Sequence, residues 1–133
     1  MTVHLTQTNS STGHTRLFLT VPAPCPWINS NKRIHRMQEA KLTAAWREAG
    51  YLAARGLMPE TGPVTIWASV WKPIANRYDP QNLYGTGKAV VDGFRDAGIL
   101  ADDDWRHVSG PFMIHGGIGP ACLILEIVPA TTP

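Results

Sequence analysis

Hydrophobic residues recur at every second position along some segments of the chain and at every third or fourth position along others. Residues 64–70 place an aliphatic or alanine side chain at every second position, with polar residues or tryptophan between them, which is the period of a β-strand. Residues 42–53 carry apolar side chains three and four positions apart, which is the period of one helix face. The pattern therefore predicts a protein that mixes strands and helices.

Prolines and glycines mark where these segments stop. Pro22 follows the first apolar segment, and Gly56 and Gly98 follow the two helical ones. The order strand, helix, strand, helix, strand, strand indicates an α/β (α+β) fold, a single compact domain with a mixed sheet of about four strands and two main helices. The predicted strands cover residues 16–21, 63–73, 112–115 and 121–128, and the predicted helices cover residues 31–55 and 86–97.

The apolar faces of these elements give the expected core. In the strand at 63–73, the face that carries Trp67 and Trp71 is apolar as well, so we expect both faces to be covered, one of them by a partner subunit or by the rest of the core. The helix residues expected to face inward are Leu42, Ala45, Trp46, Ala49, Leu52, Ala53, Val90, Val91, Phe94 and Ala97.

Composition and charge narrow the class of protein. With 133 residues, 44% of them hydrophobic and 17% charged, the chain is one folded domain, predicted at residues 15–130 after a polar, poorly ordered segment at 1–14. The first residues lack the apolar run of a signal peptide, and no segment approaches the roughly 20 apolar residues of a membrane span. We therefore expect a cytoplasmic protein, in which Cys25 and Cys122 are small hydrophobic residues rather than a disulfide.

Carboxylates surrounded by cations suggest the chemistry. Asp102, Asp103 and Asp104 are adjacent and repel one another, which either open solvent or a divalent cation makes tolerable. Asp79 lies upstream of them, and the net charge of +2 is too small to indicate nucleic acid by itself. The distribution is more informative, because the acidic positions lie among Lys72, Arg77, Lys88, Arg95 and Arg106, with Lys32, Arg33 and Arg36 upstream. This pattern is typical of a metal-dependent enzyme that acts on a polyanion.

Simpler roles exist for the same residues. Asp79 followed by Pro80 is also a good helix start, and the aspartate triplet can be a solvated loop that caps the next element. Asp92 is expected to pair with Lys88 or Arg95 on the helix surface. The five histidines have no zinc-ligand spacing, and of these His107 alone stays open as a substrate contact.

Three segments together resemble the RusA family of Holliday-junction resolvases, many of which bacteriophages encode. The segments are residues 79–83 (DPQNL), residues 88–94 (KAVVDGF) and residues 96–104 (DAGILADDD). Residues 26–31 (PWINSN) are similar to the proline-rich loop near the start of the family's proteins. The resemblance covers most of the chain, and the order and spacing of the motifs are more specific than any one of them.

The resemblance implies a homodimeric endodeoxyribonuclease that nicks four-way DNA junctions symmetrically with Mg²⁺, for which Mn²⁺ can substitute. Asp79, Lys88, Asp103 and Asp104 are then the catalytic residues, and Asp79 holds metal with the later aspartates. Counting back from Val108 favours Asp103 and Asp104 as the matching pair, whereas counting forward from Gly98 favours Asp102 and Asp103. The residues expected to contact DNA are Asn29, Asn31, Lys32, Arg33, Arg36, Lys72, Arg77 and Arg106.

Gln81 departs from the family pattern, which has an aspartate at this position. A glutamine oxygen can ligate a hard cation but does not neutralise its charge, so we expect weaker metal binding. This residue keeps a second hypothesis open, that the protein binds junctions without cleaving them. A third, weaker alternative is a metal-binding domain unrelated to nucleic acid.

Overall fold

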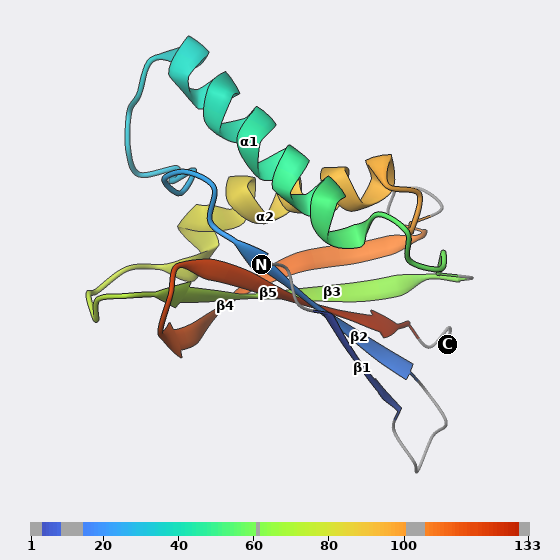
Figure 1. Ribbon diagram of the computed structural model, residues 1–133. Coiled ribbons are helices and arrows are strands. Elements are labelled where there is room, and N and C mark those ends of the chain that lie inside the picture. Colours follow the sequence, from blue (N-terminus) through green and yellow to red (C-terminus); the bar gives the residue numbers. More distant parts are fainter. Residues whose placement is uncertain (1–3, 9–14, 61, 101–105, 131–133) are drawn as a thin grey trace.

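One mixed sheet forms the base of the molecule. The computed structural model describes residues 4–8, 15–60, 62–100 and 106–130. Its strands lie in the order β1-β2-β5-β3-β4, in which β3 and β4 are parallel and every other neighbouring pair is antiparallel (Figure 1). The strands are β1 (His4–Thr8), β2 (Thr15–Pro22), β3 (Val64–Lys72), β4 (Val108–Ile118) and β5 (Cys122–Pro129).

Two helices cover one face of this sheet. They are α1 (Arg36–Ala54) and α2 (Tyr84–Asp96), and a short 3₁₀ helix, η1 (Pro80–Leu83), leads directly into α2 (Figure 1). The core lies between helices and sheet, where Trp46, Phe94 and Ile66 are fully buried. The predicted α+β class, a mixed sheet with two main helices, is therefore confirmed. Within the described residues, no helix has the length and apolar character needed to cross a membrane.

Several boundaries differ from those predicted. Residues 4–8 form β1, which pairs with β2, although this segment was expected to be poorly ordered. The first helix begins at Arg36 rather than near residue 31, because the Asn29 side chain accepts the backbone N–H of Asn31 and holds a turn there. The His35 side chain then caps the helix by accepting the Met37 N–H. β4 is also longer than the predicted strand at 112–115.

The inward faces of the elements agree with the alternation in the sequence. Val64, Ile66, Ala68 and Val70 are buried, as are Val90, Val91 and Phe94 of α2. Leu52 was expected in the core but is 44% exposed, because the buried face of α1 runs through Trp46, Gly50 and Ala53. Cys25 and Cys122 are free and half-buried, so no disulfide joins them, and burial raises the pKa of both thiols.

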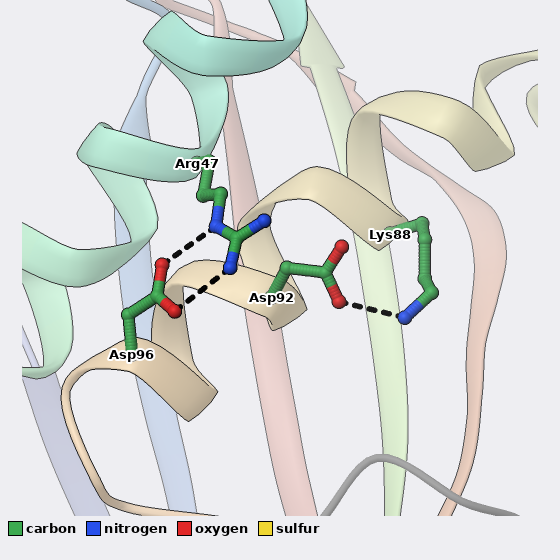
Figure 2. A network of polar contacts seen from close by, with 4 residues as sticks. All are labelled: Arg47, Lys88, Asp92 and Asp96. Carbon is green, nitrogen blue, oxygen red and sulfur yellow. Dashed lines mark hydrogen bonds and ion pairs between the residues drawn. The ribbon is translucent and has the colours of Figure 1, made fainter.

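Ion pairs lie on the exposed side of the two helices. Arg47 of α1 donates two hydrogen bonds to the Asp96 carboxylate, at 2.6 and 2.8 Å, and so joins α1 to the end of α2 (Figure 2). The hydrogen bonds from Arg47 and its charge lower the pKa of Asp96, with nearby Arg95 adding to the effect and partial desolvation opposing it. Lys88 pairs with Asp92 one turn further along α2 at 2.6 Å, as the sequence predicted for Asp92 (Figure 2).

Candidate functional site

A cleft of about 790 Å³ lies between the segment that leads into α1 and the segment that joins β3 to α2. One wall is lined by residues 26–32, Ile34 and the first half of α1, and the other by Lys72, residues 76–79, Gln81, Asn82, Tyr84 and Gly85. The charged side chains along the cleft are the cations Lys32, Lys72 and Arg77 and the carboxylates Glu39 and Asp79. Because the cations outnumber the carboxylates, the charge of the cleft favours an anionic ligand. A ligand bound there would also lie near a carboxylate.

Buried contacts hold the first wall against η1 and α2. The Ile28 backbone N–H donates to the Thr86 hydroxyl, which in turn donates to the Ile28 carbonyl, at 2.9 and 3.0 Å. Thr86 is fully buried, so both of these bonds lie away from water. Trp27 stacks on Trp46 of the core, with ring centroids 5.2 Å apart. A proline-rich segment is thereby fixed in place, and Asn29, Asn31 and Lys32 are presented to the cleft.

Asp79 stands at the N-terminus of η1 and caps it. Its Oδ1 accepts the backbone N–H of Gln81 at 2.9 Å, and Pro80 occupies the first helical position. The simpler role proposed for Asp79 is therefore present in the structure. A cap uses one carboxylate oxygen, however, and Asp79 is exposed on the cleft, so the second oxygen has access to a ligand or a cation.

Gln81 is tied to the sheet by its side chain. The Gln81 Nε2 donates to the Met113 carbonyl of β4 at 2.7 Å, while the residue also lines the cleft. An aspartate at this position has no hydrogen to donate, so this bond depends on an amide. The departure from the RusA pattern therefore coincides with a structural contact between η1 and β4.

Lys72 and Tyr78, which line the cleft, form a connected group with His115 of β4. The Lys72 ammonium lies 3.8 Å from the centroid of the Tyr78 ring, which is a cation–π contact. The Tyr78 hydroxyl is 2.6 Å from His115 Nδ1 on β4. Burial lowers the pKa of Lys72, the positive charge of Lys32 lowers it further, and burial raises the pKa of Tyr78.

The cleft gathers most, but not all, of the residues that the sequence singled out. Asp79 and five of the eight predicted DNA contacts line it; these five are Asn29, Asn31, Lys32, Lys72 and Arg77. Arg33 is exposed before α1 and Arg36 is exposed as its first residue, but neither lines the cleft, and Arg106 is exposed before β4. Lys88 lies in the second turn of α2, outside the cleft lining and paired with Asp92.

The predicted metal ligands are not all within the described part of the chain. Asp102, Asp103 and Asp104 lie outside the described residues. Among the residues that the structure does describe, no group of three histidine, cysteine, aspartate or glutamate side chains is placed to hold one ion. Of the four aspartates predicted to hold metal, Asp79 is the one that lies within the described residues.

Sequence reasoning missed three residues of the cleft. Tyr78 carried no motif, and its importance comes from contacts with Lys72 and with His115, which is 37 positions away. Glu39 adds a second carboxylate from α1, and Tyr84 adds a half-exposed aromatic ring.

No protein-family model matches the chain, and no curated protein matches it either.

Proposed function

We propose that the protein is a RusA-like endodeoxyribonuclease that uses Mg²⁺, or Mn²⁺ in its place, to nick four-way DNA junctions. The single observation that carries this proposal is the composition of the cleft. Lys32, Lys72 and Arg77 come from three separate segments and meet in one concave site that also holds Asp79. Cations and amides that contact phosphates, beside a carboxylate that can hold a metal, are the parts that phosphodiester hydrolysis requires.

In this proposal each group has a separate task. Asp79 holds the metal through the oxygen that does not cap η1, together with the aspartates at 102–104, and Lys88 assists at the phosphate. When bound, the metal supplies a Lewis acid that stabilises charge on the phosphodiester oxygens. The cations and amides of the cleft, with Arg33, Arg36 and Arg106 outside it, contact the DNA backbone.

A second candidate function is supported by Gln81. Because its amide donates to the Met113 carbonyl, the residue serves the contact between η1 and β4. A cleft that keeps its cations but has a neutral group at this metal position suits a protein that binds junctions without cleaving them. Cleavage and binding must therefore be measured separately.

The proposal is tested with a synthetic four-way junction and a linear duplex of the same sequence. We expect paired nicks on the junction alone, with Mg²⁺ or Mn²⁺ and not with a chelator. Junction binding in the chelator should weaken steeply with salt, by roughly a thousandfold between 50 and 200 mM if about six phosphates are contacted. Binding without nicks under every metal would favour the second candidate, and a flat salt response would exclude both.

We further propose that two copies associate through the open face of the sheet. Trp67 and Phe112 are 40% and 42% exposed there, their ring centroids are 5.0 Å apart, and Ile114 lies beside them on β4. Arg16 and Glu126 on this face already pair with each other, so these two charges need no new partner when two such faces meet. With strands about 4.8 Å apart and about eight residues long, the open face of the sheet covers roughly 500 Å² in each copy. Two such faces would bury about 1,000 Å² in total, which reaches the size expected of a specific interface.

Replacing Trp67 by glutamate should separate the two copies. The variant places an unpaired carboxylate beside Phe112 within the exposed apolar patch of this face, so we expect the dimer dissociation constant to rise about thirtyfold or more. Sedimentation equilibrium measures this, with Met58→Glu as the matched control because Met58 is 84% exposed in the segment after α1. A wild-type protein that remains monomeric at 100 μM, or equal effects of the two variants, would contradict the proposed interface.

A further inference from the structure

Two lysines from opposite walls, Lys32 and Lys72, line the same cleft as Tyr78. Lys32 belongs to the turn before α1, where its backbone N–H donates to the Asn29 carbonyl, and Lys72 is the last residue of β3. Both line the cleft, and the charge of Lys32 disfavours protonation of Lys72. Two ammonium groups that repel each other in a concave site gain most from an anion placed between them.

The Tyr78 ring restrains the position of the Lys72 ammonium. A lysine side chain is flexible, and ordering it costs up to about 2 kcal/mol of conformational entropy. The ring of Tyr78 under the ammonium, 3.8 Å from centroid to Nζ, restricts that side chain before any ligand arrives. The five residues between Lys72 and Tyr78 are all exposed. We therefore attribute the restraint on the Lys72 side chain to Tyr78 rather than to this connecting segment.

Tyr78 is itself held by the sheet. Its hydroxyl lies 2.6 Å from His115 Nδ1, and the two rings are T-shaped to each other with centroids 5.6 Å apart. A chain of contacts therefore runs from β4 through His115 and Tyr78 to the Lys72 ammonium at the cleft. The two ends of this series of contacts are His115 on β4 and Lys72 on β3. Because β4 pairs with β3 along its length, both ends belong to the same part of the sheet.

We infer that Lys32 and Lys72 form a seat for one phosphate group, and that Tyr78 is the positioning residue that holds Lys72 there for binding. The seat takes a phosphodiester of the DNA backbone if the proposed function is correct. It requires only a phosphate anion, however, so it can be tested apart from DNA.

The decisive experiment is a double-mutant cycle that combines Lys72→Met with Tyr78→Leu. Junction affinity is measured by fluorescence anisotropy in chelator. We expect each single variant to weaken binding about fivefold, the loss of one ordered cation at a phosphate, and the double variant to be no weaker than Lys72→Met alone. Effects that multiply would mean that Tyr78 acts independently of Lys72 and would overturn its positioning role.

Tyr78→Phe gives the matched control because it keeps the ring and loses only the hydroxyl. We expect it to bind within about twofold of the wild type, since the cation–π contact with Lys72 and the edge-to-face contact with the His115 ring both remain. If Tyr78→Phe is as weak as Tyr78→Leu while both variants keep the wild-type circular dichroism spectrum, the ring does not position Lys72 and the inference fails.

Inorganic phosphate separates this inference from the proposed function. Titration into protein with ¹³C-methylated lysines should shift the NMR signals of Lys32 and Lys72 together in the wild type and less in Tyr78→Leu. Such shifts without junction binding would keep the seat and remove the DNA assignment. Junction binding that is unaffected by Lys72→Met and Tyr78→Leu would do the reverse, and the absence of both phosphate shifts and junction binding would overturn both.

Discussion

Gly93→Ala is expected to destabilise the protein by about 3 kcal/mol, although alanine is normally the better helix former by about 1 kcal/mol. A Cβ at Gly93 would lie 2.1 Å from the Arg47 carbonyl oxygen and 2.6 Å from the Tyr51 backbone nitrogen of α1. Both obstacles are backbone atoms of a packed helix and cannot rotate away. A Cβ at Gly50 would likewise lie 2.3 Å from the Val90 carbonyl oxygen of α2, so the two helices cross backbone against backbone.

The free energy of unfolding measured in urea tests this prediction against two other glycines. A Cβ at Gly62 meets nothing within 4 Å, so Gly62→Ala should leave stability within about 0.5 kcal/mol of the wild type. A Cβ at Gly85 meets only the Ile28 side chain, with Cγ2 nearest at 3.1 Å, and this side chain can move, so the cost of Gly85→Ala should be intermediate. A Gly93→Ala variant as stable as Gly62→Ala would mean that α1 and α2 do not cross this closely.

This helix crossing could not be predicted from the sequence, while the buried face of β3 could. Alternation at residues 64–70 reflects a local period of two, and the buried positions Val64, Ile66, Ala68 and Val70 follow it directly. Gly50 and Gly93 carry no such signal in the sequence, because each glycine is required by the backbone of the helix that crosses it. The late start of α1 was missed for a related reason, since a turn held by the Asn29 side chain competes with good helix formers.

The candidate site shows the same division between local and distant contacts. Its basic and amide residues were predicted as a set, and five of them do line one cleft with Asp79. The partners of individual side chains were harder to predict. The bond from Gln81 to the Met113 carbonyl spans 32 positions, and that from Tyr78 to His115 spans 37. Only the pair of Lys88 and Asp92, four positions apart on one helix, was predictable from spacing.

Asp79→Asn should abolish metal-dependent nicking, with a loss of at least about a hundredfold, while leaving the fold intact. Asparagine caps a helix about as well as aspartate, so its side-chain oxygen can still accept the Gln81 N–H. We therefore expect a free energy of unfolding within about 0.5 kcal/mol of the wild type. Junction binding should be unchanged or tighter, because a negative charge leaves a cleft that contains Lys32, Lys72 and Arg77.

Asp79→Ala separates the two roles of this carboxylate, since it removes the cap and the charge together. It should lose nicking as Asp79→Asn does, and in addition about 1 kcal/mol of stability. Glu48→Gln, which neutralises an exposed carboxylate of α1 outside the cleft lining, should keep full activity. Nicking that persists in Asp79→Asn but falls with stability in Asp79→Ala would mean that Asp79 only caps η1. Loss of nicking in both, with the cap kept in one, assigns the second carboxylate oxygen to the metal.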